Sequence, residues 1–210
     1  MIDLKNIKNI IFDLGGVILD IDENRTKQAF IQLFAENTEI VWNYFRDSQI
    51  NIALEKGIID PDDFRSQLIK KSGKNVSFQD FDRAWNAILI DFKNERLEII
   101  KNIKIQYNTF LLSNTNQIHY NIFTSWLENN YNTTWNDLFT IAWFSHTLHE
   151  KKPDLEIYKK VLVLGHLKPE ETLFIDDLEE NLAAAAKLGI KTVKATKDYG
   201  IIEMFGGDFL

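Results

Sequence analysis

The chain has 210 residues, 45% of them apolar, and its 24 lysines and arginines against 31 aspartates and glutamates leave a net charge of −7. The absence of cysteine excludes disulfides, thiolate metal sites and a cysteine nucleophile, and the acidic balance argues against a protein that binds nucleic acid by neutralising phosphates. No apolar run reaches about 18 residues and no signal-peptide pattern opens the chain, so we expect a cytoplasmic protein without a membrane partner.

The first expected strand covers residues 7–12, an almost continuous apolar run that stops at Asp13 and the Gly15-Gly16 pair. Continuous apolarity is typical of a strand that is covered on both faces, as in a parallel sheet. We therefore expect this strand to lie inside a sheet rather than at its edge.

The segment of residues 20–94 carries helical patterns but no convincing strand. Asp60 followed by Pro61 looks like an N-cap with proline at the first helical position. Helices are expected at residues 24–35, 40–50, 61–71 and 78–89. Such a block after a first strand predicts a helical insertion.

Beyond residue 94, strand and helix patterns alternate. Strands are expected at residues 109–112, 140–144, 172–175 and 191–195, and helices at 95–105, 117–127, 155–164 and 178–188. This alternation predicts an α/β fold with a parallel sheet and right-handed crossovers. The core domain would then comprise residues 1–19 and 95–210, and the helical cap domain residues 20–94.

Polar side chains stand near the carboxyl ends of the expected strands, where open α/β sheets bind ligands. They are Asp13, Ser113, Asn114, Lys152, Asp176 and Asp177. Each has an ordinary alternative as a turn residue, a helix cap or a solvated charge. Their order after the right strands favours a common site.

Three aspartates at one sheet edge would repel one another unless a cation intervenes. Their hard oxygen atoms favour Mg²⁺ over Zn²⁺. A cation beside Lys152 and Ser113, near glycines that expose backbone amides, makes a site for a phosphoryl group. An aspartate can attack such a group and form an aspartyl-phosphate.

Four motifs make the chain resemble the haloacid dehalogenase-like (HAD) hydrolase superfamily over essentially its whole length. They are Phe12-Asp13-Leu14-Gly15-Gly16-Val17, Phe110-Leu111-Leu112-Ser113-Asn114, Lys152-Pro153-Asp154 with Ile157-Tyr158, and Phe174-Ile175-Asp176-Asp177 continuing to Leu188-Gly189. The resemblance implies a Rossmann-like core with a helical cap inserted between the first two motifs. It also implies a magnesium-dependent phosphomonoester hydrolase that acts on a small phosphorylated metabolite.

The resemblance implies a role for each motif residue. Asp13 is the expected nucleophile and a metal ligand, and the Gly15 carbonyl, Asp176 and Asp177 are the expected further metal ligands. Lys152 is expected to neutralise Asp13 and the transferring group. Ser113 and the Asn114 backbone are expected to hydrogen-bond the phosphoryl oxygens.

Gly15 departs from the pattern of most phosphatases of this superfamily, which carry an acid–base aspartate there. Its loss removes catalysis commonly worth about 10²–10⁴ in rate. The stretch Asp13-Leu14-Gly15, with Val17 to Asp22 after it, resembles bacterial α-D-glucose-1-phosphate phosphatases. That subgroup makes a sugar phosphate the expected substrate class, with water or a cap residue replacing the missing acid.

Two other functions remain open. A 2-haloacid dehalogenase would attack carbon without a metal, and a non-hydrolytic binding module would have lost turnover with the acid–base group. The oligomeric state, monomer or homodimer, is also open. Further candidates for substrate contact, each with an ordinary structural alternative, are Arg25, the Glu55-Lys56-Gly57 turn, Trp42, Trp85, His119, His146 and His149.

Overall fold

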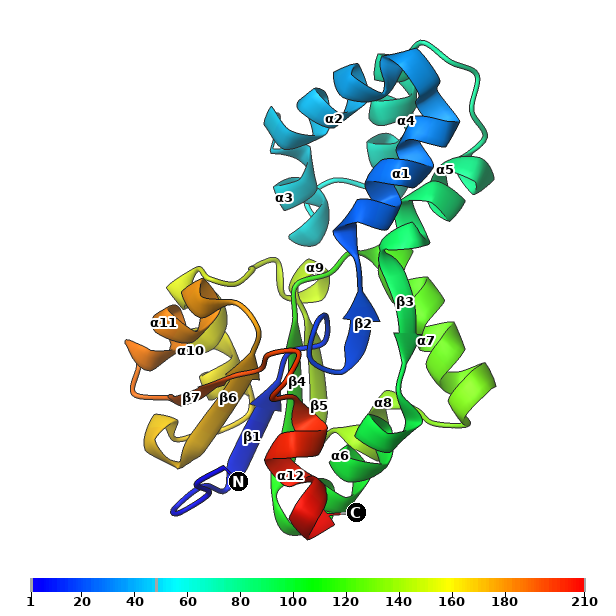
Figure 1. Cartoon of the computed structure of the whole chain (residues 1–210). Coiled ribbons are helices and arrows are strands. Elements are labelled where there is room, and N and C mark those ends of the chain that lie inside the picture. The colour runs from blue at the N-terminus through cyan, green and yellow to red at the C-terminus, as the bar shows by residue number, and fades with distance from the viewer. Residues whose placement is uncertain (1, 48, 210) are drawn as a thin grey trace.

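The computed structural model describes residues 2–47 and 49–209. Its core is a five-stranded parallel sheet in the order β5-β4-β1-β6-β7 (Figure 1). The strands are β1 (Asn9–Phe12), β4 (Asn108–Ser113), β5 (Ile141–Phe144), β6 (Thr172–Asp176) and β7 (Lys191–Lys194). The expected α/β fold with a parallel sheet is confirmed.

Alternation of side chains along β1 explains why both faces of the sheet are covered. Ile10 and Phe12 belong to one apolar cluster, whereas Ile11 between them belongs to another on the opposite face. The first cluster includes α6 (Asn94–Gln106), α7 (Gln117–Tyr131), α8 (Trp135–Leu138) and α12 (Ile201–Phe209). The second includes α10 (Leu155–Leu164) and α11 (Glu179–Ala186).

A separate group of helices lies above the carboxyl ends of the strands, at the top of Figure 1. These cap helices are α1 (Glu23–Phe34), α2 (Thr38–Asp47), α3 (Ile50–Glu55), α4 (Pro61–Ser72) and α5 (Phe78–Trp85). They enclose an aromatic core in which Phe30, Phe34, Phe64 and Phe81 are fully buried. Contacts between aromatic rings in such a core add to the stability that the burial of apolar surface provides.

The expectation that residues 20–94 contain no strand was wrong. Strands β2 (Leu19–Ile21) and β3 (Leu89–Phe92) pair antiparallel and form a two-stranded ribbon. Arg96 also donates to Asp20 at 2.6 Å beside this ribbon. Strands this short leave only a weak alternation in a sequence.

We propose that this ribbon marks the passage between a core of residues 1–19 and 95–210 and a cap of residues 20–94. Residues 1 and 210, at the ends of these ranges, lie outside the described residues, as does residue 48 of the helix expected at 40–50. That helix is interrupted, because α2 ends at Asp47 and α3 begins at Ile50. The helix expected at 78–89 also ends early, since η2 (Asn86–Ile88) leads into β3.

Several helices were not predicted from the sequence. They include the short segments α3, α8, α9 (Ser145–Leu148), η1 (Ala35–Asn37) and η3 (Pro169–Glu171), and the nine-residue α12. Within the described part of the chain, no helix combines the length and apolar character that crossing a bilayer requires.

Candidate active site

Two aspartates meet where the strand order of the sheet reverses. Asp13 directly follows β1, and Asp176 ends the adjacent strand β6, with Phe12 paired to Ile175 in register. Both are buried, with 7% and 0% of their surfaces exposed. Carboxyl ends of neighbouring parallel strands at such a switch point form the crevice in which these folds bind ligands.

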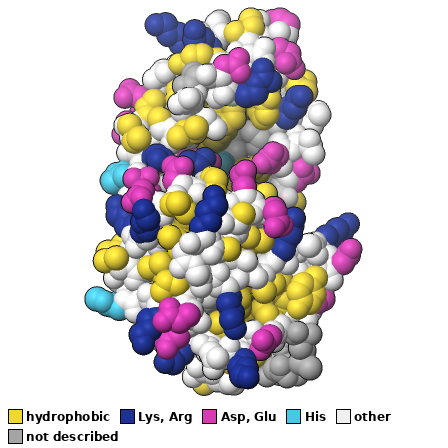
Figure 2. All heavy atoms as spheres, turned by 90° about the vertical axis from the view of Figure 1, so that its left-hand side faces the viewer, with side chains coloured by type: hydrophobic (Ala, Val, Ile, Leu, Met, Phe, Trp, Pro, Cys, Tyr) yellow, Lys and Arg dark blue, Asp and Glu magenta, His cyan; other side chains and the backbone are white. Residues whose placement is uncertain are grey.

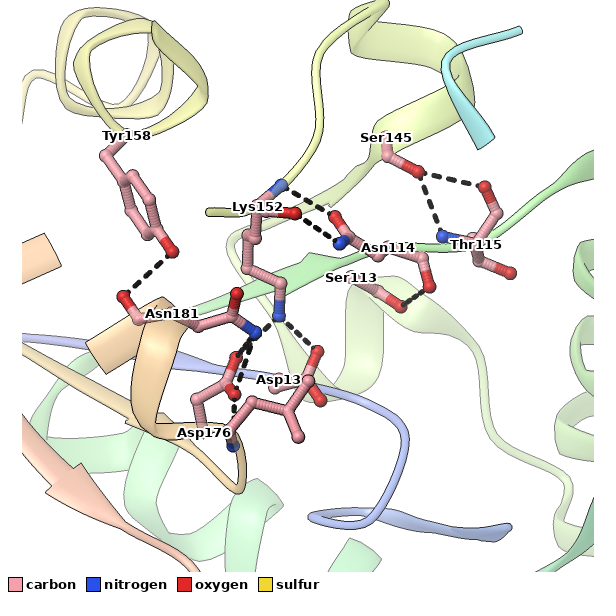
Figure 3. Close-up of polar contacts among 10 residues, drawn as sticks. Asp13, Ser113, Asn114, Thr115, Ser145, Lys152, Tyr158, Asp176 and Asn181 are labelled. Atoms are coloured by element: carbon pink, nitrogen blue, oxygen red, sulfur yellow. Dashed lines mark hydrogen bonds and ion pairs between the residues drawn. The ribbon is translucent and has the colours of Figure 1, made fainter. Parts of the chain in front are cut away.

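Lys152 joins the two aspartates. Its ammonium donates to Asp13 Oδ1 at 2.5 Å and to Asp176 Oδ2 at 2.7 Å, and Lys152 itself is 2% exposed (Figure 3). The Asn114 side chain fixes the lysine backbone from two sides. It donates to the Lys152 carbonyl at 2.8 Å and accepts from the Lys152 amide at 2.9 Å. Asn114 therefore positions the lysine through its side chain, a role that its motif did not indicate.

Burial and charge shift the titration of the acidic groups. Burial raises the pKa of Asp13 to about 7, even though the Lys152 ammonium opposes this rise. Burial and the neighbouring charge of Asp176 also raise the pKa of Asp177. Burial by itself would lower the pKa of Lys152, but the charges of Asp13 and Asp176 outweigh it and raise that pKa. Asp13 and Asp176 thus share the Lys152 ammonium, and Asp177 adds a third carboxylate beside them.

Asp13, Asp176 and Asp177 form a donor set that fits a metal ion. Each offers a carboxylate oxygen, and these oxygens lie within 4.8 Å of one another. Gly15 lies beside Asp13 and Asp177 on the wall of the cavity described below. Oxygen donors with no nitrogen or sulfur among them suit a hard cation such as Mg²⁺.

Asn181 is a residue that the sequence interpretation missed. Its Nδ2 donates to both Asp176 oxygens, at 3.0 and 3.1 Å, and its backbone carbonyl accepts from the Tyr158 hydroxyl at 2.9 Å. The amide of Leu178 also donates to Asp176 Oδ1 at 2.8 Å. The available signal was a carboxamide in the first turn of the helix that follows the acidic pair.

The loop after β4 is tied to the end of β5. Ser145 Oγ accepts from the Thr115 amide and donates to the Thr115 carbonyl, both at 2.9 Å. Ser113 ends β4, is 2% exposed, and has its Oγ 3.5 Å from the Asn114 carbonyl. Ser113 therefore lies near the site, but Asn114, Thr115 and Asn116 are the residues of this loop that line the cavity.

A cavity of about 480 Å³ extends from Asp13 and Lys152 up to the cap helices. Its cap side combines apolar rings with polar groups, among them Trp42, Trp85 and Glu55. This size and mixture are typical of a site for a small organic ligand. Trp42 and Trp85 also pack in the cap's apolar core, and their contact with a substrate stays a prediction.

His119, which also lines the cavity, has a defined tautomer. Asn86 Nδ2 donates to the Asp82 carbonyl at 2.8 Å, so its Oδ1 faces His119 Nδ1 at 2.8 Å. Nδ1 therefore carries the proton, and Nε2 is the acceptor. The ring stacks on Trp85 at 5.3 Å, and burial lowers the pKa of His119 to about 3. His119 is neutral at physiological pH.

The remaining candidates lie elsewhere. Arg25 is exposed and does not line the cavity. Lys56 pairs with Glu150 and Asp154, and His149 Nδ1 lies 2.9 Å from the Lys56 carbonyl. His146 is buried beside a second hollow, which Gly57 and Asp60 also line.

The family model described as haloacid dehalogenase-like hydrolase matches residues 10–195. The chain belongs to this family. The expected HAD resemblance is therefore confirmed, and the protein is an enzyme of the hydrolase class.

Relatives that match over most of their length include a D-ribitol-5-phosphate phosphatase from Bacteroides thetaiotaomicron. It is 32% identical over 186 residues, which cover 89% of this chain and 90% of the relative. A HAD family enzyme of the same organism, solved in complex with magnesium and inorganic phosphate, shares 34% identity at a TM-score of 0.81. That alignment covers 90% of this chain and 94% of the other.

Other solved structures extend the comparison. A HAD-like hydrolase from Porphyromonas gingivalis is 29% identical, with a TM-score of 0.81 and 90% of each chain covered. A solved dehalogenase is 18% identical, with a TM-score of 0.63 over 94% of this chain and 87% of the other. At that identity the dehalogenase shares the fold alone with this chain.

Proposed function

We propose that this protein is a magnesium-dependent phosphomonoester hydrolase that acts on a small sugar or sugar-alcohol phosphate through an aspartyl-phosphate on Asp13. The observation that carries the proposal is Lys152 between Asp13 and Asp176 at the core end of the cavity that reaches the cap helices. The phosphatase relative and the magnesium and phosphate in a solved family member support it.

Charge balance explains why the metal would be needed. Three carboxylates and an incoming phosphate dianion would meet one lysine cation. Two like charges 4 Å apart repel by about 4 kcal/mol at an effective dielectric of 20. Asp13, Asp176, Asp177 and the Gly15 carbonyl would hold the ion. A bound Mg²⁺ supplies positive charge that offsets this repulsion and polarises the phosphoryl oxygens.

The chain's own residues supply the covalent chemistry. A carboxylate oxygen of Asp13 forms a bond to phosphorus while the ester oxygen leaves and takes a proton from water or from a cap residue. Lys152 stabilises the charge on Asp13 and on the transferring phosphoryl group. Ser113 and the Asn114 backbone hold phosphoryl oxygens. Water then attacks phosphorus, which releases inorganic phosphate and restores the Asp13 carboxylate.

The site can hold Asp13 ready for this attack. Lys152 is buried and held at its backbone by Asn114, so its ammonium is fixed against Asp13 without further ordering. Asn181 and the Leu178 amide fix Asp176 in the same way.

A cytoplasmic location and a monomeric or homodimeric state remain predictions from the sequence.

Turnover assays test the proposal. We expect hydrolysis of p-nitrophenyl phosphate and ribitol 5-phosphate with Mg²⁺, loss of activity with EDTA, and background rates for Asp13→Asn. Asp13→Asn keeps the shape of the site but removes the nucleophilic carboxylate. Halide release from a 2-haloacid without Mg²⁺, or phosphate binding without turnover, would contradict the proposal and select one of the two alternative functions.

A further inference from the structure

An ion pair between the cap and the core lies on the cavity wall. Glu55, the last residue of α3, accepts from the Lys151 ammonium at 2.5 Å, and both residues line the cavity. Their side chains are 28% and 20% exposed, so the pair is partly shielded and still reachable from the cavity. Lys151 directly precedes Lys152, which holds Asp13.

A second ionic contact crosses the same junction without lining the cavity. The Lys56 ammonium lies 3.1 Å from Glu150 Oε2 and 3.0 Å from Asp154 Oδ2. Figure 2 shows lysine, arginine and acidic side chains gathered in a band across the middle of the molecule on this side. Two neighbouring residues of the cap thus make similar pairs, but only Glu55 makes its pair at the cavity.

The charges on the cavity wall are unfavourable for a second anionic group. Among the described residues, Lys151 and Lys152 are the lysines and arginines that line the cavity, and each is paired with carboxylates. His119 is neutral, and the exposed carboxylates of Glu23 and Glu180 add negative charge. A carboxylate or second phosphate on the leaving group would therefore find no unpaired lysine or arginine there.

The same pair suits neighbouring hydroxyl groups. A carboxylate accepts hydrogen bonds, and an ammonium has three donors, of which Glu55 uses one. One hydroxyl can donate to Glu55 while the next accepts from Lys151. Glu55 belongs to the cap helix α3 and Lys151 to the core, so a polyol that contacts both binds to cap and core at once.

We propose that the Glu55–Lys151 pair determines substrate specificity. This proposal rests on the proposed phosphatase function. It binds the hydroxyl groups of an uncharged polyol leaving group and rejects phosphomonoesters that carry a second anionic group. Rejection arises because Glu55 neutralises Lys151.

The test compares kcat/KM for ribitol 5-phosphate and glucose 6-phosphate with kcat/KM for 3-phosphoglycerate. We expect the wild type to favour the polyol phosphates by about 100-fold or more. Glu55→Gln should lower kcat/KM for the polyol phosphates about tenfold, mainly through KM, because a carboxylate acceptor is lost. The same variant should raise kcat/KM for 3-phosphoglycerate about tenfold, because Lys151 becomes free to bind its carboxylate.

Two further variants separate specificity from closure of the cap. Glu55→Gln combined with Lys151→Gln should lose the gain on 3-phosphoglycerate, since that gain requires the lysine. Glu150→Gln, the matched control at the neighbouring ionic contact, should leave the substrate ratio unchanged. Thermal unfolding of each variant verifies that it is folded.

Several results would overturn the proposal. They are equal changes on both substrate classes in Glu55→Gln, the same ratio shift in Glu150→Gln, or a wild type that hydrolyses 3-phosphoglycerate as well as the polyol phosphates. A wild type that hydrolyses neither these esters nor p-nitrophenyl phosphate would instead contradict the proposed phosphatase function.

Discussion

Gly15 and Gly16 are adjacent glycines next to Asp13, and their surroundings differ. A Cβ atom on Gly15 would lie 3.0 Å from Cδ1 of Ile21, the far end of a flexible side chain. A Cβ atom on Gly16 would lie 2.5 Å from Asp177 Oδ2, and Gly16 has a φ of +75°. Position 15 can therefore accept a side chain after a small shift of Ile21, whereas position 16 requires glycine.

Gly15→Asp tests whether an acid–base group is missing. The new carboxyl would protonate the leaving oxygen, so we expect the single-turnover rate of phosphoryl transfer from an alkyl ester such as ribitol 5-phosphate to rise by about 10²-fold at most. p-Nitrophenolate leaves without protonation, so the single-turnover rate of its formation should change little. Gly15→Asn is the control of similar size without an acid. No rise in the ratio of the two rates would show that this position does not limit proton transfer.

His119 gives a pH prediction for stability. Burial lowers its pKa from 6.5 to about 3, so the unfolded state binds more protons between these values. Stability should therefore fall as pH drops from about 6.5 towards 3, by up to about 1.4 kcal/mol per pH unit for this one group. Urea unfolding at pH 6.5 and pH 5 should show a smaller pH effect in His119→Gln. The exposed His149→Gln serves as control, and identical pH effects in both variants would contradict the assignment.

At the scale of elements, the turn after α3 is where the cap meets the core. Gly57 has a φ of +62°, and a Cβ atom there would lie 2.2 Å from the His146 carbonyl oxygen. Gly73, at the end of α4, has a similar φ of +63° but nothing within 4 Å of its Cβ position. The two glycines share the backbone conformation and differ in the contact.

Gly57→Ala and Gly73→Ala separate backbone strain from docking of the cap. Both should lose about 1–2 kcal/mol of stability from the left-handed conformation. Gly57→Ala should also lose kcat/KM by about tenfold, because the collision displaces α3 and Glu55 from the cavity. Urea unfolding and steady-state kinetics measure the two effects. Equal kcat/KM in the two variants would show that this contact does not shape the site.

The elements that could be predicted are those with long, regular patterns. The buried strands β1, β4 and β6 have apolar centres, and the helices α6, α7, α10 and α11 lie within four residues of the bounds expected from the sequence. The ribbon strands β2 and β3 each carry an aspartate in the middle of the strand, and the helices α3, α8 and α9 have six residues or fewer. Such segments are determined by tertiary contacts, which the sequence does not display.

At the scale of the molecule, the site could be predicted in part. The four motif positions of Asp13, Lys152, Asp176 and Asp177 could be found because they follow the strands and resemble a known family. The side-chain roles of Asn114 and Asn181 could not, because they depend on where Lys152 and Asp176 lie in space. The Glu55–Lys151 pair joins residues 96 positions apart and had no local signal.

In the molecule as a whole, the cap helices lie over the carboxyl ends of the sheet strands, where Gly15 leaves the proposed nucleophile Asp13 without an acid–base partner. In this account the ester transfers its phosphoryl group to Asp13, and slow attack by water then limits turnover. The covalent species should therefore accumulate during the steady state. This accumulation depends on the site as a whole and not on any single helix or strand.

Acid quenching during turnover of p-nitrophenyl phosphate with Mg²⁺, followed by peptide mass spectrometry, measures this species directly. We predict a phosphoryl group on the peptide that contains Asp13, absent in Asp13→Asn and absent without Mg²⁺. Turnover that continues with no phosphoryl group on Asp13 at any quench time would contradict it.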